Sequence, residues 1–401
     1  MTPPPVRAGP ACTGSPHRAD RRRPGYPRPL RSWPHPVQPG TVRTRPSTAA
    51  RVTVHGEHPN VITNPPQQKH LGRRTYARPA ARTVASSEHQ LWLAHHLTPR
   101  DRWITRMLHE HRVLTTHQIV ELGWTGRRAA NLRLLELYRW RVLDRFQPLV
   151  PAGLAPMHYI LDVAGAAVLA HEDGLDPRKI GYQHDRAKGI AHSLHLAHRV
   201  AVNGVFTRLV HHARQPGAVG TLTAWWPEER CARHFGDIVR PDAFGRWTTR
   251  GGATVEWFLE LDYGTEPLHR VAAKLTHYQQ LATSTRIATP ILLWTTTARR
   301  EARIRQAMTQ TLHNLDRPEL VPVATTAADL TPPDQHLDPT PARWLPLTAP
   351  RPGRLGLHQL PNVPPHLRPT ARQDDTTDPS DPSGRLHPPH PMPPTSLHPA
   401  A

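Results

Sequence analysis

The sequence has only two cysteines and no long apolar run. Cys12 and Cys231 lie far apart in a chain of 401 residues, so neither a disulfide framework nor a cysteine-based zinc site is expected. No apolar stretch is long enough to span a bilayer, which argues against a membrane partner. The arginines at 21–23 are not followed by the apolar core of an export signal. These absences predict a cytoplasmic protein.

Motifs for nucleotide or tyrosine chemistry are also lacking. No Walker A motif is present and no GxGxxG loop follows a strand, which argues against an ATPase or a nucleotide-cofactor enzyme. Tyr263 and Tyr278 are not accompanied by the histidine triad that a tyrosine nickase needs. His192, His195 and His198 are spaced three apart, whereas a helical zinc pair uses positions i and i+4. We expect these histidines to pack or to face solvent, with a role in proton transfer or phosphate contact as the alternative.

Apolar residues are scarce at both ends of the chain. Only 37% of all residues are hydrophobic, and 47 are proline. Residues 1–85 and 326–401 are rich in proline and show almost no apolar periodicity, so both are predicted to be disordered tails. Residues 86–325 remain as the folded part.

Positive charge is concentrated in the first tail. The formal net charge of the chain is +20, and residues 1–85 contain 15 Lys and Arg against Asp20 and Glu57. Such a basic arm can bind a polyanion through counterion release, with little sequence preference. The alternative is that this excess of Arg, Pro, Ala and His reflects GC-rich coding, and the arm could then be an over-extended reading frame. Both interpretations stay open.

Residues 86–165 carry the pattern of a winged helix-turn-helix. Thr98 can cap a helix that has Pro99 in its first turn and an apolar stripe behind it. Two shorter helices follow, separated by a tight turn at Gly123, which is typical of the helix-turn-helix arrangement. The further elements expected are a helix beginning after Thr115 or Thr116, a helix at about 125–140, and two wing strands at 142–146 and 158–162.

The third of these helices is expected to enter the major groove of duplex DNA. Its predicted DNA-binding residues are Arg127, Arg128, Asn131 and Arg133, which can reach phosphates or base edges. The alternative is that they are solvated polar residues on a small domain. Leucines at 132 and 135 form a second apolar side on this helix, which indicates packing against a partner or against the next domain, so a homodimer stays open.

After a predicted linker at 166–186, residues 187–325 alternate between helical and strand-like patterns. The run PILLWTTT at 290–297 is typical of a buried central strand. The predicted order is α-β-β-β-α-β-α-β, so the fold class is α/β. The elements are expected at 187–213 (helix), 220–226, 237–244 and 254–263 (strands), 266–282 (helix), 290–297 (strand), 299–314 (helix) and 320–324 (strand).

Three carboxylates stand at strand positions where a charge is unfavourable unless it is paired or functional. Glu260 and Asp262 are two residues apart, so they share one face of their strand. Asp242 on the preceding strand can lie beside them across a hairpin. Such a cluster can hold Mg²⁺ or Mn²⁺, which prefer oxygen ligands and activate water in phosphodiester cleavage. We therefore predict Asp242, Glu260 and Asp262 as metal ligands.

The order of elements and these carboxylates resemble the PD-(D/E)xK nuclease superfamily and its restriction-endonuclease-like core. Pro241-Asp242 matches the PD element, and Glu260-Leu261-Asp262 stands at the (D/E)xK element. The chain departs from the family because Asp262 replaces the lysine that positions the attacking water. Lys274 on the following helix, with Tyr278 one turn further, is the candidate substitute. The resemblance thus implies Asp242, Glu260, Asp262 and Lys274 as catalytic residues.

The two units together resemble the replication-relaxation family over residues 97–325. The stretches that carry this resemblance are LTPRDRWITRMLHEHRVLTTHQIVEL, HLAHRVAVNGVFTRL, RPDAF and VEWFLELDYGTEPLHRVAAKLTHYQQ. The family occurs on plasmids and integrative elements of high-GC bacteria, and its name associates it with plasmid replication and DNA relaxation. The resemblance implies duplex DNA, expected to be plasmid DNA, and replication or transfer proteins as partners.

Three functions are consistent with these patterns. The first is a DNA-binding accessory protein of a mobile element, in which the carboxylate site is vestigial. The second is a Mg²⁺- or Mn²⁺-dependent endonuclease that cuts or nicks DNA. The third is a transcriptional regulator whose second domain only dimerises.

Overall fold

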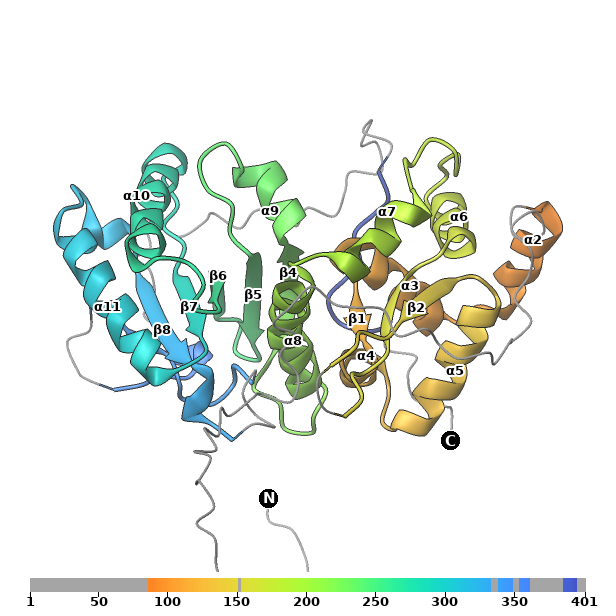
Figure 1. Cartoon of the computed structure of the whole chain (residues 1–401), viewed down its shortest axis with the longest axis horizontal. Coiled ribbons are helices and arrows are strands. Elements are labelled where there is room, and N and C mark those ends of the chain that lie inside the picture. Colours follow the sequence, from red (N-terminus) through yellow and green to blue (C-terminus); the bar gives the residue numbers. More distant parts are fainter. Residues whose placement is uncertain (1–85, 151–152, 333–337, 349–352, 361–384, 395–401) are drawn as a thin grey trace, which may run out of the picture. The chain divides into compact units, whose positions relative to one another are not determined.

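The computed structural model describes residues 86–150, 153–332, 338–348, 353–360 and 385–394 (Figure 1). All of them belong to one compact unit of the chain. The fold is mixed α/β, as the sequence predicts. The predicted basic arm at 1–85 lies outside the described residues. None of the helices within these described ranges is both long and apolar enough to cross a membrane.

Helices dominate the first part of the described chain, and side-chain caps determine where two of them begin. Thr98 and Asp101 form a capping box, in which Thr98 accepts from the Asp101 amide and Asp101 accepts from the Thr98 amide at 2.8 Å. Thr115 and Gln118 form a second box. The helices are α2 (Ser87–His96), α3 (Pro99–His111), α4 (Thr116–Gly123) and α5 (Arg127–Arg139).

A small antiparallel sheet completes this part of the fold. Its strand order is β1-β3-β2, and it consists of β1 (Leu114–Thr115), β2 (Leu143–Phe146) and β3 (His158–Leu161). Helix α6 (Val163–Glu172) follows directly and packs against α3. It contacts β2 so closely that a Cβ at Gly165 would collide with the Val142 carbonyl. The predicted linker at 166–186 therefore contains most of a buried helix.

The long helix predicted at 187–213 is broken in the structure. It consists of α7 (His184–Gly189), the 3₁₀ turn Ile190–His192 and α8 (Leu196–Ala213). At the break, the Ser193 hydroxyl accepts from the His195 amide at 3.1 Å, which is a local bond that competes with helix formation. The break turns Leu194 outward, where it is 72% exposed.

A six-stranded mixed sheet forms the second part, in the order β4-β5-β6-β7-β8-β9. The first three strands are antiparallel, β6, β7 and β8 are parallel, and β9 returns antiparallel. The strands are β4 (Gly220–Pro227), β5 (Ala243–Thr249), β6 (Thr254–Asp262), β7 (Ile291–Thr295), β8 (Val323–Ala327) and β9 (Leu345–Pro346).

Helices cover both faces of this sheet (Figure 1). Helix α8 packs on one face, in an apolar core that continues into the α3–α5 region. Helices α10 (Leu268–Thr285) and α11 (Ala298–His313) share a second core on the other face. The alternation of side chains along the strands explains this division, because neighbours such as Trp257 and Phe258 point to opposite faces.

A loop lies where the sequence analysis predicted the start of a strand. The predicted strand at 237–244 is wrong in its first part, because α9 (Glu228–Phe235) and a loop join β4 to β5, which begins only at Ala243. Cys231 and Phe235 give α9 one buried side four residues apart. The predicted strand thus began in the exit loop of a short amphipathic helix, and the helix itself was not predicted.

The sheet continues beyond residue 325, where the sequence analysis predicted that the folded part ends. Arg343 is buried, donates to the Thr326 hydroxyl at 3.0 Å and to the Ala327 carbonyl at 2.8 Å, and stacks on Trp294. Further along, residues 385–394 lie across α3, where the Trp103 indole donates to the His390 carbonyl at 2.8 Å. The prediction of a disordered tail from 326 onward is therefore wrong for the parts of this tail that the structure describes.

Candidate functional sites

Asp242 lies directly before β5 and is bonded to the middle of the Glu260-Leu261-Asp262 segment. Ala243, the first residue of β5, pairs with Leu259, so the Leu261 amide lies beyond the end of the ladder. The Asp242 carboxylate takes the place of the missing strand partner and accepts from this amide at 2.7 Å. The predicted proximity of Asp242 to the carboxylate strand is therefore present.

His198, on α8, contacts both Asp242 and Leu261. Its Nε2 lies 3.0 Å from the Leu261 carbonyl oxygen and 3.2 Å from Asp242 Oδ2. Burial lowers the pKa of His198, but the hydrogen bond and the charge of Asp242 outweigh it, so the pKa is raised overall. The sequence analysis considered this histidine mainly as a packing residue, since nothing in its spacing connects it to a strand 60 residues later.

Glu260 is buried and is held by two side chains of α10. Lys274 Nζ donates to one of its oxygens at 2.8 Å, and the Tyr278 hydroxyl donates to the other at 2.5 Å. Burial raises the pKa of Glu260, the charge of Lys274 lowers it, and the charge of Asp242 raises it further. Lys274 and Tyr278 are one helical turn apart, which places both on the face of α10 that meets β6. The sequence analysis predicted that Lys274 belongs to this site, but it predicted no role for Tyr278.

Asp262 has a different set of partners. Its carboxylate receives the Arg300 guanidinium in a two-point contact, with N···O distances of 2.9 and 3.0 Å, and the Thr295 hydroxyl at 2.9 Å. Arg300 also donates to the Glu266 carbonyl. A planar bidentate pair of this kind is strong and geometrically specific. The structure thus uses Asp262 to join β6 to the start of α11.

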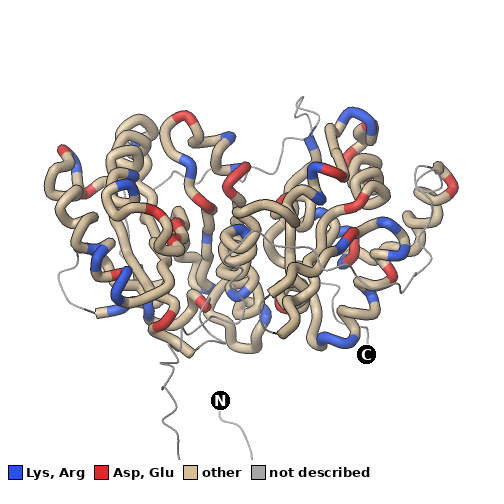
Figure 2. The backbone as a smooth tube through the Cα atoms, viewed as in Figure 1, with Lys and Arg blue, Asp and Glu red and all other residues tan. Residues whose placement is uncertain are grey.

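The cluster fits an oxygen-ligated cation in part. Asp242 and Glu260 are carboxylates near one another, and carboxylate oxygen is the donor type that Mg²⁺ and Mn²⁺ prefer. Both Glu260 oxygens are bonded to Lys274 and Tyr278, so a cation there would have to displace one of these contacts. Asp262 does not fit as a ligand, because both of its oxygens are bonded to Arg300. In Figure 2 acidic positions lie close together where the central strands end, with basic positions on the neighbouring helices.

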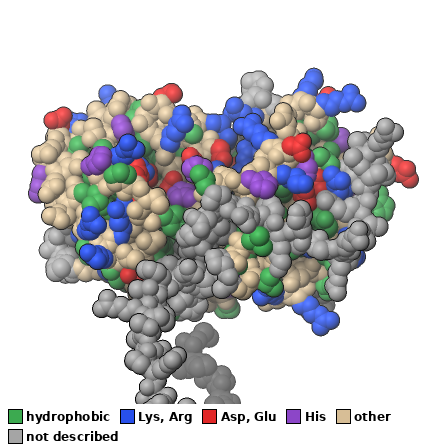
Figure 3. Space-filling view, viewed as in Figure 1, with side chains coloured by type: hydrophobic (Ala, Val, Ile, Leu, Met, Phe, Trp, Pro, Cys, Tyr) green, Lys and Arg blue, Asp and Glu red, His purple; other side chains and the backbone are tan. Residues whose placement is uncertain are grey.

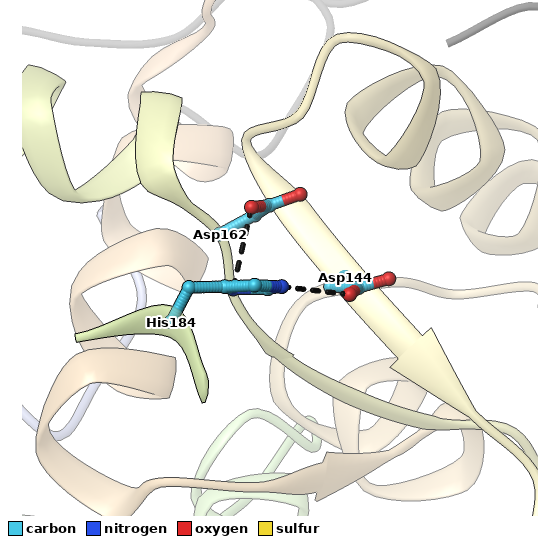
Figure 4. A group of neighbouring side chains, drawn as sticks. All are labelled: Asp144, Asp162 and His184. Atoms are coloured by element: carbon cyan, nitrogen blue, oxygen red, sulfur yellow. Dashed lines mark ion pairs between the residues drawn. The ribbon is translucent and has the colours of Figure 1, made fainter. Parts of the chain in front are cut away.

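Among the described residues, a different group of side chains has the arrangement most like a metal site. Asp144, Asp162 and His184 place their ligand atoms within 4.8 Å of one another (Figure 4). His184 lies 3.1 Å from Asp144 and 3.4 Å from Asp162. Asp162 is also engaged by Arg141 at 2.8 Å and by the Val163 amide at 2.7 Å. These contacts form an ion-pair network that holds α7 against β2 and the start of α6.

The residues predicted to contact DNA divide into two groups. Arg127, Arg128 and Asn131 are exposed near the start of α5. Arg133 is instead bound within the chain, because it donates to the buried Asp101 at 2.6 Å and lies 4.7 Å above the Trp140 ring. Arg133 thus connects α5 to the capping box of α3.

Fold and site together define a mixed α/β protein in which a three-helix unit precedes a sheet with an Asp–Glu–Lys cluster at its strand ends. Residues 106–291 match the model of the replication-relaxation family, so the resemblance predicted from the sequence is confirmed over this region. The match contains Asp242, Glu260 and Lys274 and ends in β7. Neither a curated protein nor a solved structure matches the chain.

Proposed function

We propose that the chain is a DNA-binding protein that acts in the replication of a plasmid or another mobile element. In this proposal α3, α4, α5 and the β2–β3 hairpin form a winged helix, and α5 enters the major groove of duplex DNA. The family match supports the replication context. The order of three helices followed by two wing strands supports the docking mode.

The observation that carries the proposal is the pair of arginines at the start of α5. Arg127 and Arg128 are exposed, and no hydrogen bond or ion pair joins their side chains to other described residues. Helix α5 has no side-chain cap and no acidic residue in its first turn. Cations at a helix N-terminus are unfavourable by about 0.3–1 kcal/mol each, because they oppose the helix dipole. Folding does not explain these arginines, whereas binding of DNA phosphates does.

The test is the salt dependence of binding to duplex plasmid DNA by the full chain. The variant Arg127→Ala/Arg128→Ala is expected to lower the slope of log K against log salt by about 1.8, since each lost phosphate contact removes about 0.9. Arg178→Ala/Arg317→Ala is the matched control, because it removes two exposed arginines away from α5. Equal slopes for the two double variants would contradict docking through α5.

A second candidate function is metal-dependent cleavage of DNA. The observation in its favour is the 2.8 Å contact of Lys274 with Glu260 beside Asp242, since it supplies the cation that the (D/E)xK element lacks. In this candidate Asp242 and Glu260 hold Mg²⁺ or Mn²⁺, and the bound ion would supply the charge that activates water. Lys274 would orient the water or the phosphate, while Asp262 would only hold Arg300.

A further inference from the structure

An insertion separates two strands that are direct neighbours in the sheet. β4 and β5 pair antiparallel, and such strands can be joined by a two-residue turn. Here α9 and a loop connect them and end at Asp242. Cys231 on α9 packs in the same apolar core as Phe258 on β6 and Tyr278 on α10, and burial raises the pKa of its thiol. The insertion thus adjoins the candidate site.

The insertion presents cations to solvent beside that site. Arg233 and Arg240 are exposed, and Arg240 stands two residues before Asp242. Arg112, at the end of α3, adds a third cation whose side chain is 49% exposed. Arg112 has φ 68°, a left-handed conformation that non-glycine residues rarely adopt. In Figure 3 Lys and Arg side chains gather at the top centre of this face, between the α9 and α7 segments labelled in Figure 1.

Arg112 and Arg233 repel one another. The pKa of Arg233 is lowered by burial, and Arg385, Arg230 and Arg112 lower it further against the opposing effect of Glu110. Burial together with Arg112 and Arg106 also lowers the pKa of His109 to about 4.

Two acidic residues nearby offset part of this crowding, but neither forms an ion pair with Arg233 or Arg240. Glu229 forms a 2.7 Å ion pair with Arg199, and Arg112 is 4.0 Å from it. Glu110 is 3.9 Å from Arg230, which is too long for a hydrogen bond. Like charges held together at a surface destabilise a fold, and such arrangements are typical of sites that bind the opposite charge.

We propose that Arg233 and Arg240, with Arg112 beside them, form a second DNA contact that holds the phosphate backbone against the Asp242–Glu260 site. The proposal rests on the proposed DNA binding and adds a surface that α5 does not include. Guanidinium groups suit this ligand because their planar N–H forks match phosphate oxygens. This surface binds DNA without sequence preference, because it contacts only the phosphates of the DNA backbone.

The experiment compares Arg233→Ala/Arg240→Ala with Arg250→Ala/Arg317→Ala in the full chain. Arg250 is an equally exposed arginine in the β5–β6 turn, at the opposite end of β5 from Asp242. Binding to duplex DNA is measured across salt concentrations, and thermal stability is measured for each variant. The first variant is expected to lower the salt slope by about 1.8 and to weaken binding roughly tenfold for all DNA sequences tested. Its Tm should stay equal or rise, because repulsion is relieved.

Two results would overturn the inference, and they differ in their consequences. If the chain binds DNA and both double variants have the wild-type slope, the α9 surface is not a DNA contact, although binding through α5 stands. If the wild-type chain binds no duplex DNA even at low salt, the proposed function fails together with the inference. The salt slope of Arg127→Ala/Arg128→Ala, measured in parallel, shows how many of the phosphate contacts belong to α5 and how many to the surface beside α9.

Discussion

Glu260 and Asp262 lie two residues apart on β6, but their partners give them different chemistry. Asp262 is held by a bidentate arginine, whose planar fork is pre-organised for a carboxylate. Glu260 is held by an ammonium and a phenol, each of which makes one hydrogen bond with it. The Lys274 stem is flexible, so its ammonium can turn from Glu260 to a phosphate. At the scale of single residues, we therefore propose that any reaction at this site would depend on Asp242, Glu260 and Lys274.

The residue-scale prediction concerns nicking of supercoiled plasmid in Mg²⁺ or Mn²⁺. If the site is catalytic, Asp242→Asn removes a ligand and Lys274→Met removes the orienting cation, and each should reduce cleavage by at least about 100-fold. Asp237→Asn is the control, because Asp237 is an exposed acid on the same loop. Gel analysis of nicked and linear plasmid measures the result.

The outcome separates the two candidate functions. Cleavage that needs metal and is lost in both variants makes the chain an endonuclease. Equal cleavage by wild type and Asp242→Asn would exclude this site as its source. DNA binding without any cleavage leaves the chain an accessory DNA-binding protein with a retained carboxylate scaffold.

At the scale of elements, the interruption before α8 determines what this helix contacts. Helix α8 packs between α4 and the sheet, and Asn203 on it donates to the Val113 carbonyl at 2.8 Å. The break at Ser193 lets the chain change direction after α7, so that α8 can reach both surfaces. His198 near its start then reaches Asp242. A continuous helix from 187 would have carried Leu194 into the core instead.

The element-scale prediction compares two leucines on either side of this break. Leu194→Ala should change the free energy of unfolding by less than about 0.5 kcal/mol, because Leu194 is 72% exposed. Leu196→Ala should destabilise by about 2–5 kcal/mol, because Leu196 is fully buried. Urea unfolding of the full chain measures both. A large loss for Leu194→Ala would support the continuous helix that the sequence pattern predicts.

At the scale of the whole molecule, residues near the C-terminal end complete the packing of the first helices. Leu386 is buried against α6 and the end of β3. His387 donates its amide to Asp173 at 2.8 Å, and Arg106 donates to the His387 carbonyl at 3.0 Å. The family match ends at residue 291, so this packing comes from a segment outside the matched region.

The prediction at this scale is that Leu386→Ala lowers the stability of the protein. Loss of a buried leucine side chain should cost about 2–5 kcal/mol, with a lower Tm in calorimetry. Arg385→Ala is the neighbouring control, since Arg385 is exposed and its loss should leave the Tm within a degree or two. Equal Tm values for the two variants would restore the original prediction of an unstructured tail.

Much of the fold was predictable because local chemistry determines it. The cap at Thr98, the apolar alternation of β6 and the continuous apolar run of β7 are confirmed at nearly the predicted positions. The errors fall where local patterns are ambiguous. α9 has only eight residues, and its exit loop resembles a strand in composition. The many prolines near the C-terminal end led to the prediction of disorder, although a few apolar residues there, such as Leu386, are buried.

The sequence by itself determined most of the elements, the α/β class and the meeting of Asp242 with the Glu260 strand, because strand periodicity and chain order act over short distances. Only the tertiary structure decided the partners of these side chains. Arg300 is 38 residues from Asp262, and His198 is 63 residues from Leu261. Contacts between such distant residues form when helices pack on the sheet. The spacing of residues in the sequence does not indicate which side chains will then be partners.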